Sequence, residues 1–354
     1  VEMVHIESVD PVEMDPDIFD TSGASVGDLP ELGGAAAIAS RAFQAGQRVF
    51  CEKALIIAPS PTNLSRVRAY CALSPEDRQM MLEHFWGEAP EVRCAATAAC
   101  RPGEGFGDSA AEVLTLLRDE GEQSLELTDV EAVIRIFNLN AYDSALGLLA
   151  CKVSHSCSPN VSIRVDPETR AIEAIACRNI EAGESLGTWY FQDTGLWWMG
   201  SDVRRALFET DRGFLCGCSR CRSSDACRSL PCEACGAKGK VMPTGYAASA
   251  PTASPAWKCF GCGRESATGD AVRRAAEAEI VPRVLLELRP PRGVPKAPPE
   301  ELVALAADVR TRLGDHHWAA AAAALVLHCR CRPVGGQLDP FSVACGTRFL
   351  GWLL

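Results

Sequence analysis

The sequence predicts an α+β fold, and three patterns support this prediction. Apolar and polar residues alternate from Val161 to Val165, and a second apolar run from Ala171 to Cys177 follows a short turn, which is typical of a hairpin. Apolar residues recur at helical spacing over 108–119 and 318–331. Several cysteine pairs with two residues between them lie in 216–262. We therefore expect small β-sheets, a helical insertion, a metal-binding region and an α-helical carboxy-terminal module.

Composition sets the broad class of protein. The chain has 354 residues, 47% of them hydrophobic, which is enough for a sizeable core and for two or three domains. No run approaches the roughly 20 apolar residues that a membrane helix needs, so we expect no membrane association. The net charge of −11 argues against a general nucleic-acid binder. An acidic surface suits a basic peptide partner, although it also serves solubility alone.

The first forty residues contain no Lys or Arg and carry several Asp and Glu residues. A basic segment followed by an apolar one, as in a secretory signal, does not occur there. We therefore expect a loosely held acidic arm over 1–32 and a location in the cytoplasm, the nucleus or both. Thiols are reduced in these compartments, so regularly spaced cysteines indicate metal binding rather than disulfides.

One short sequence pattern, an Ala-Gly turn beside apolar segments, occurs twice along the chain. Residues 33–46 and 49–52 form two apolar segments separated by an Ala-Gly turn, and we expect them to form a β-hairpin. The same Ala-Gly turn occurs in residues 177–184, again before an apolar segment. The chain therefore uses one turn design twice.

Helical patterns fill the region between these two Ala-Gly turns. Pro75 opens a helical stretch that reaches Phe85, and a second stretch covers 108–119. Thr128 and Glu131 form a capping-box pattern, which predicts a helix leading to 138–142.

Beyond Ala267 the chain is expected to be α-helical. Helices are predicted over 270–280, 299–313 and 318–331, with a stiff Pro-rich link over 289–299. The histidines in this region, His316, His317 and His328, match no metal-ligand spacing. Packing and helix-terminal charge account better for them.

The segment Ser154-His155-Ser156-Cys157-Ser158-Pro159-Asn160 is the centre of the functional prediction. Its Pro and Asn break a helix, so it is expected to be a turn that can hold a ligand-binding backbone. Read alone, it would be an ordinary tight turn with a buried free cysteine.

Two cysteine patterns follow downstream. Cys232-x-x-Cys235 with Cys259-x-x-Cys262 has zinc-ribbon spacing, because two tight cysteine knuckles complete a tetrahedral thiolate site. The alternative is chance clustering in a cysteine-rich chain. The CxCxxC pattern at 216–221 supplies only three ligands, and structural zinc takes four. The spacing leaves the fourth ligand open among Cys157, Cys227, Cys151 and Cys177.

Four ordered motifs resemble the SET-domain protein lysine methyltransferases, in particular the branch related to the SET-and-MYND group. They are GGAAAIASRAFQAGQRVF, SHSCSPN, GESLGTWY and FLCGCSRC. The inserted region lacks the cysteine and histidine spacing of a MYND domain, so the chain resembles a MYND-less, SMYD-like relative.

The resemblance implies a SET β-fold with a pseudoknot, a zinc-binding post-SET and ribbon region, and a helical end. The expected parts are an acidic arm 1–32, the SET amino-terminal part 33–60, a helical insertion 61–127, the SET carboxy-terminal part 128–195, a post-SET region 196–222, a zinc ribbon 223–266 and a helical module 267–354.

The resemblance also implies residue roles. Tyr190 matches the catalytic tyrosine; read alone, it would be a core aromatic at the end of a strand. The residues expected to bind S-adenosylmethionine are Gly34, Ala36, Asn140, Ser154, His155 and Phe214. One structural zinc would be held by Cys157, Cys216, Cys218 and Cys221, and a second by Cys232, Cys235, Cys259 and Cys262.

We therefore expect methyl transfer to a lysine of a histone or non-histone protein by a monomer that does not bind nucleic acid directly. Three positions depart from the family pattern. Ala36 replaces a glycine, Ser154 an asparagine and Arg212 a channel tyrosine. They motivate the alternative, a catalytically weak or inactive zinc protein that acts as a protein interaction module.

Overall fold

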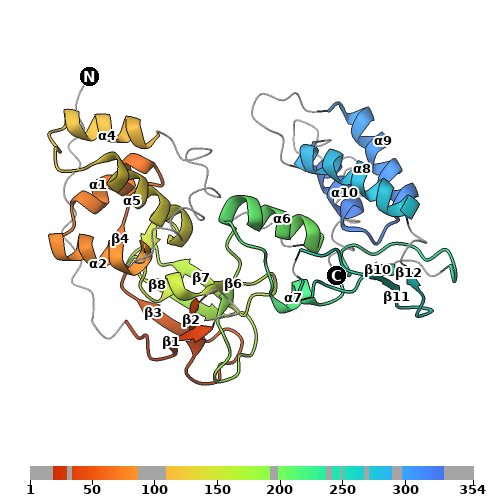
Figure 1. The fold of residues 1–354 in the computed structure, drawn as a ribbon, viewed down its shortest axis with the longest axis horizontal. Coiled ribbons are helices and arrows are strands. Elements are labelled where there is room, and N and C mark those ends of the chain that lie inside the picture. Colours follow the sequence, from red (N-terminus) through yellow and green to blue (C-terminus); the bar gives the residue numbers. More distant parts are fainter. Residues whose placement is uncertain are drawn as a thin grey trace. The chain divides into compact units, whose positions relative to one another are not determined.

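The computed structural model describes residues 19–29, 34–86, 109–191, 198–236, 241–247, 249–250, 252–266, 271–288 and 297–330 (Figure 1). Most of the expected acidic arm and of the Pro-rich link lies outside these residues. The chain divides into two compact units. The first contains residues 1–190 and 211–213, and the second contains residues 191–210 and 214–354.

A three-stranded antiparallel sheet lies at the centre of the first unit. Its order is β3 (Arg48–Glu52), β8 (Ile172–Ala176) and β7 (Val161–Val165). The predicted hairpin is confirmed, since Val161 pairs with Ala176 and Val165 with Ile172. The outer strand β7 alternates between buried and more exposed residues, whereas the central strand β8 is almost entirely buried because both of its faces are covered.

Three two-stranded sheets surround it. They are β1 (Ala24–Leu29) with β2 (Gly34–Ala39), β4 (Ile56–Ile57) with β5 (Ala145–Leu146), and β6 (Ser154–His155) with β9 (Gly187–Thr188). The β6–β9 pair is parallel and the other two are antiparallel.

The hairpin expected from 33–46 and 49–52 is wrong. Strand β2 pairs with β1, and β3 pairs with β8, so the two segments lie in different sheets. The segments that lead into the two Ala-Gly turns instead pair with each other. Phe43 and Ile180 each donate a backbone hydrogen bond of 2.9 Å to the other. Gly46 and Gly183 have φ angles of 85° and 82°, which glycine adopts without strain.

The loosely held arm expected over 1–32 is also corrected in part. Residues 24–29 form β1, with Ala24 opposite Ala39. The side chains of β1 are exposed or half-buried and none is fully buried, so backbone pairing rather than apolar burial holds the strand. Composition alone therefore gave no sign of it.

The insertion is helical, as predicted, and forms its own core. Its described helices are α1 (Asn63–Cys71), α2 (Pro75–Trp86) and α4 (Ala110–Asp119), and α5 (Leu127–Asn140) packs against them (Figure 1). Buried side chains from all four helices meet in one cluster, including Val67, Met81, Val113 and Phe137. Helix α1 was not predicted as a separate element.

The start of α5 differs from the prediction. The backbone N–H of Glu126 donates to Asp129 Oδ2 at 2.9 Å, and the helix begins at Leu127. The expected Thr128–Glu131 box is therefore wrong, because an acidic pair two residues earlier starts the helix.

The second unit combines a small cysteine-rich sheet with helices. The sheet has the order β10 (Val241–Pro243), β11 (Trp257–Cys259) and β12 (Glu265–Ser266). The helices are α6 (Ser201–Arg212, whose last two residues belong to the first unit), α7 (Ser219–Arg222), α8 (Ala271–Leu288), α9 (Pro299–Arg312) and α10 (Trp318–Arg330). The three carboxy-terminal helices are confirmed, but α8 continues through Pro282 well past its predicted end.

A buried ion cluster joins the ribbon region to the helical module within this unit. Glu277 of α8 accepts hydrogen bonds of 2.7 Å from both Nε and Nη2 of Arg228, and its Oε1 lies 3.0 Å from His317 Nε2. The Arg228 guanidinium also lies over the Trp257 ring at 5.0 Å. A buried carboxylate needs such partners, because leaving it unpaired in the interior is costly.

Glu277→Ala should lower the free energy of unfolding by about 3 to 5 kcal/mol, because it leaves the buried Arg228 without its bidentate partner. Urea unfolding measures this loss. The matched control is Glu279→Ala on the same helix, whose exposed pair with Arg312 should contribute little. Equal losses in the two variants would contradict the assigned role of the buried cluster.

The same cluster predicts a pH dependence. Burial acts to raise the pKa of Glu277, but the hydrogen bonds and charges of Arg228 and His317 outweigh it and hold the pKa at about 2. A depressed pKa means that the stabilisation is present above the ordinary pKa of about 4.3 and is lost as the pH falls towards 2. The stability difference between wild type and Glu277→Gln should shrink over this window.

Candidate functional site

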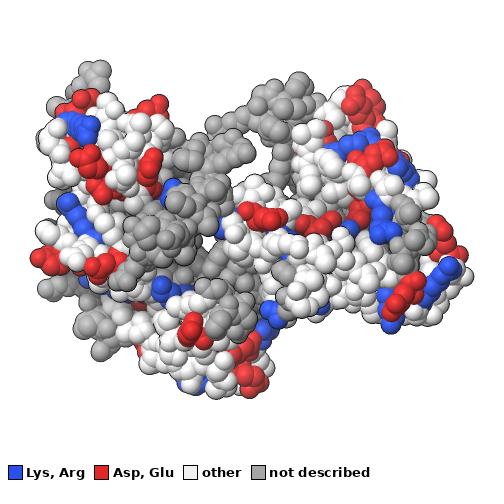
Figure 2. All heavy atoms as spheres, viewed as in Figure 1, with Lys and Arg blue, Asp and Glu red and all other residues white. Residues whose placement is uncertain are grey.

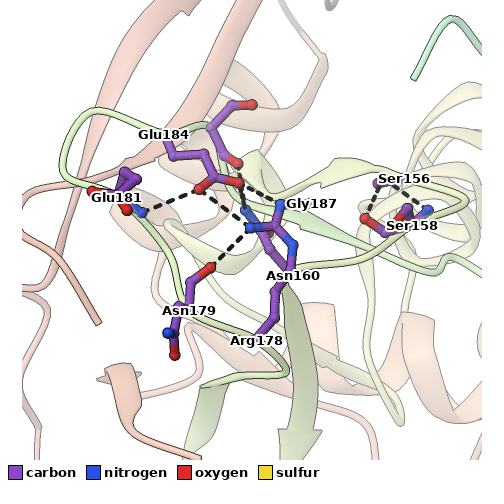
Figure 3. Close-up of polar contacts among 9 residues, drawn as sticks. Ser156, Ser158, Asn160, Arg178, Asn179, Glu181, Glu184 and Gly187 are labelled. Atoms are coloured by element: carbon purple, nitrogen blue, oxygen red, sulfur yellow. Dashed lines mark hydrogen bonds and ion pairs between the residues drawn. The ribbon is translucent and has the colours of Figure 1, made fainter. Parts of the chain in front are cut away.

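One buried side chain, Asn160, connects two segments that are far apart in the sequence (Figure 3). Its Oδ1 accepts the Gly187 N–H at 2.7 Å, and its Nδ2 donates to Ser185 O and to Glu184 Oε1, both at 2.9 Å. Asn160 is only 3% exposed. The amide therefore fixes the SHSCSPN segment against the GESLGTWY segment.

Backbone bonds extend this contact in both directions. Asn160 N donates to Gly187 O at 3.0 Å, and Ser156 N donates to Thr188 O at 2.8 Å. A Cβ on Gly187 would lie 2.8 Å from the Cβ of Ser156, so only glycine allows this approach. Strands β6 and β9 consequently lie side by side, and Tyr190 lies two residues after the end of β9.

Figure 3 also shows how the ends of the two segments are held. Glu184 accepts from the Arg178 guanidinium and from the Glu181 N–H, the latter at 3.1 Å. Burial acts to raise the pKa of Glu184, but its hydrogen bonds from Arg178, Glu181 and Asn160 lower it below the ordinary value. The carboxylate is therefore charged at neutral pH and keeps its hold on the Asn160 amide.

The predicted catalytic residue Tyr190 has a defined environment. Its hydroxyl donates to Val153 O at 2.9 Å. Burial raises the pKa of Tyr190 to about 12, although the Arg212 guanidinium, 5.9 Å from the centre of its ring, acts in the opposite direction. Burial also raises the pKa of the neighbouring Tyr142. Both side chains are therefore neutral phenols at neutral pH, which suits hydrogen bonding rather than proton abstraction.

His155 lies between Tyr190 and a predicted metal ligand. The centre of its ring is 5.4 Å from that of Tyr190 and 5.3 Å from that of Trp189. Its Nε2 lies 3.3 Å from Cys157 Sγ, and both side chains are buried.

The remaining predicted cofactor residues come from several elements. In the first unit, Gly34 and Ala36 open β2, Asn140 ends α5 and Ser154 begins β6. Strand β2 reaches the site because Leu186 N donates to Ala37 O at 2.8 Å. Phe214 belongs to the second unit, where its ring stacks on Phe208 at 5.4 Å. These cofactor roles stay predictions.

The four ribbon cysteines fit a zinc ion. Their sulfur atoms all lie within 4.8 Å of one another, with Cys232–Cys262 at 3.9 Å and Cys235–Cys259 at 3.8 Å. Four sulfurs at the usual Zn–S distance of about 2.3 Å in a tetrahedron are separated by about 3.8 Å. The N–H groups of Cys262 and Gly261 point at Cys259 Sγ, and these hydrogen bonds lower the pKa of Cys259 to about 7.

A second group of cysteines lies in segment 216–221, which precedes the ribbon in the same unit. The sulfur atoms of Cys216, Cys218 and Cys221 lie within 4.8 Å of one another, and they too could hold a metal ion. Cys227, an alternative fourth ligand in this unit, instead lies with its Sγ 3.3 Å from Arg220 Nη2. The predicted fourth ligand Cys157 belongs to the first unit.

Sequence reasoning missed Glu52. This buried carboxylate ends β3 and accepts the N–H groups of Leu149 and Ala150, so it fixes the turn just before Val153. Burial raises the pKa of Glu52, and the backbone hydrogen bonds act against that rise. The only signal was a charged residue at the end of the apolar run VFCE.

Sequence reasoning also missed a cavity of about 680 Å³ between β4 and α1. All of its lining residues lie between positions 54 and 73. Its lining contains none of the predicted site residues.

Part of the chain matches a known family model. Residues 34–191 match the family model described as the SET domain, so this region has a SET-domain fold with mixed helices and strands. No helix in the described part of the chain has the length and apolar character needed to cross a membrane.

Curated relatives are named Histone-lysine N-methyltransferase SET5. The protein from Yarrowia lipolytica is 33% identical over 90 residues, which cover 25% of this chain and 20% of that protein. The protein from Scheffersomyces stipitis is 31% identical over 87 residues, 24% of this chain and 17% of that protein. The protein from Eremothecium gossypii is 29% identical over 135 residues, 37% of this chain and 25% of that protein. The chain thus spans a quarter or less of the length of these relatives.

Solved structures with a similar course include that of Rubisco LSMT bound to AdoMet, with 12% identity, 93% of this chain and 84% of that chain covered, and a TM-score of 0.36. The SET domain of LSMT bound to lysine and AdoHcy is also 12% identical, with 94% and 84% covered and a TM-score of 0.33.

Asn160→Ala should lower the free energy of unfolding by about 2 to 4 kcal/mol, because it leaves the Gly187 N–H and the Ser185 carbonyl without their buried partner. Urea unfolding of the purified chain measures the change. Asn179→Ala is the matched control; its exposed side chain accepts a single bond from Ala45 N, and its loss should be below about 1 kcal/mol. Similar values for the two variants would refute the central role of Asn160.

Proposed function

We propose that this chain transfers a methyl group from S-adenosylmethionine to a lysine side chain of a protein. One observation carries the proposal: within the SET-domain region, the Tyr190 hydroxyl is held by Val153 O next to the paired strands β6 and β9. The names of the curated relatives support the same reaction.

The chemistry accounts for a neutral tyrosine. Bound S-adenosylmethionine supplies a methyl group activated by its sulfonium. The lysine nitrogen forms the new N–C bond as the C–S bond breaks, and it needs a free electron pair, so the ammonium first gives its proton to water. With a pKa of about 12, Tyr190 keeps its own proton and acts by orienting the amine, as alignment catalysis requires.

The finer assignments belong to this proposal. We assign cofactor contacts to Gly34, Ala36, Asn140, Ser154, His155 and Phe214, and a pseudoknot to the crossing of the SHSCSPN and GESLGTWY segments. The bonds of Asn160 support the pseudoknot. The chain would be a MYND-less relative of the SET-and-MYND group with a post-SET segment at 196–222.

Two structural zinc ions complete the proposal. The ribbon cysteines fit one by their sulfur spacing. We propose that Cys157 completes the other with Cys216, Cys218 and Cys221, since three thiolates leave a structural zinc one ligand short. Neither ion takes part in methyl transfer; each closes a segment that is too small for a hydrophobic core of its own.

Histone lysines are the first substrates to test, because the relatives are named for them. On the face shown in Figure 2, Lys and Arg lie among Asp and Glu, with no continuous basic patch over the described residues. This mixture and the net charge of −11 favour a basic peptide over nucleic acid. A monomer in the nucleus or cytoplasm fits such a substrate.

Tyr190→Phe should reduce methyl transfer about 100-fold or more, because the amine loses its orienting hydroxyl. The measurement is transfer of labelled methyl from S-adenosylmethionine to histones and to a lysine peptide library, with zinc-loaded protein. Tyr70→Phe is the matched control, since this buried tyrosine belongs to the core of the insertion and its loss should leave transfer unchanged.

Calorimetric titration with S-adenosylhomocysteine separates binding from transfer. Binding that persists in Tyr190→Phe while transfer falls supports the proposed role. A folded wild-type chain that neither binds this product nor transfers a methyl would favour the second candidate, an interaction module. The replacements Ala36, Ser154 and Arg212 in the cofactor and channel motifs are the observation behind that candidate.

A further inference from the structure

Two histidines of the first unit lie next to cysteine thiols. His155 Nε2 is 3.3 Å from Cys157 Sγ, and His84 Nε2 is 3.6 Å from Cys151 Sγ. The first pair is buried and the second is half-buried. Only the first pair includes a proposed metal ligand, and the two pairs therefore provide a site and its internal control.

We propose that His155 is a positioning residue that donates its Nε2–H to the zinc-bound thiolate of Cys157 and so couples this metal site to Tyr190. The inference rests on the proposed function only in taking Cys157 as a zinc ligand. His155 itself binds no metal.

The direction of the hydrogen bond follows from the chemistry of the ligand. A zinc-bound thiolate has no proton, so the imidazole must donate and its proton must be on Nε2. Four thiolates on one Zn²⁺ carry a net charge of −2. An N–H directed at a sulfur spreads that charge and holds the ligand in place, and removing such outer partners typically weakens metal binding 10- to 100-fold.

The ring contacts of His155 carry the coupling to Tyr190. Strand β6 has only two residues, Ser154 and His155, so side-chain contacts must fix the orientation of the imidazole. One edge of the ring faces Cys157, and the ring packs against Trp189 and Tyr190 at 5.3 and 5.4 Å. Loss of the zinc would free the first contact and loosen the packing beside the Tyr190 ring.

The test uses zinc release from the purified full chain to a chromogenic chelator. His155→Phe keeps a ring but removes the donor, and it should release one of the two zinc ions about 10 to 100 times faster than wild type. The ribbon zinc should leave at the wild-type rate and serves as a reference within each sample. His155→Gln, whose amide can still donate towards Cys157, should restore most of the slow release.

His84→Phe is the matched control, because it makes the same change beside Cys151, which is not a proposed ligand. Both zinc ions should leave this variant at wild-type rates. His155→Asn, whose amide is too short to reach Cys157, is the second donor-loss variant in case His155→Phe does not fold, and it should also release one zinc faster.

Wild-type release rates for both ions in His155→Phe or in folded His155→Asn would overturn the inference. A wild-type chain that holds only the ribbon zinc would also overturn it, together with the proposed Cys157 site. Two zinc ions with the expected release rates but no methyl transfer would refute the proposed function and leave the role of His155 standing.

Discussion

The amide of Asn160 is the interaction on which the arrangement of the first unit depends. Both of its polar atoms bond to the segment 184–187, and its backbone N–H bonds to the carbonyl of Gly187 in the same segment. Asn160 directly precedes β7, and Tyr190 lies two residues after the end of β9. One buried side chain therefore sets the central sheet and the candidate catalytic residue relative to each other. Hydrogen bonds suit this role because they are directional, whereas dispersion depends only weakly on orientation.

The polar groups around Tyr190 are likewise held by hydrogen bonds between distant segments. Glu52 holds the turn at Leu149 and Ala150, this turn leads to Val153, and the Val153 carbonyl accepts the Tyr190 hydroxyl. Each buried polar group thus meets a partner that places the next one. A phenol held in this way cannot exchange its partner freely, which keeps it oriented at little entropic cost when a substrate binds.

Local patterns in the sequence predicted elements well, but they did not predict which elements pair. The alternation in Val161–Val165 and the spacing of the ribbon cysteines each describe a local geometry, and the hairpin and the sulfur cluster followed. The apolar runs of β2 and β3 were equally clear, yet they carry no information about partners, and each strand pairs elsewhere. Strand β1 has few buried side chains and so left no apolar pattern. Glu52, Glu277 and the contact of His155 with Cys157 could not be predicted, because each depends on tertiary contacts that bring a lone polar residue to its partner.

The chemistry of zinc ligands distinguishes the two groups of cysteines. In the ribbon, four sulfurs of one unit lie at a spacing that could hold a zinc ion. In 216–221, three sulfurs cluster while Cys227, the nearby alternative, bonds to Arg220. A structural zinc there needs a thiolate from another segment, and Cys157 is a buried thiol beside an imidazole that can stabilise its charge. Cys151 lies beside His84 and a carbonyl oxygen, and burial raises its pKa to about 12, so it favours the protonated thiol over the thiolate that zinc requires. The proposed choice of Cys157 therefore rests on the SHSCSPN motif and on the burial of this thiol beside the His155 imidazole.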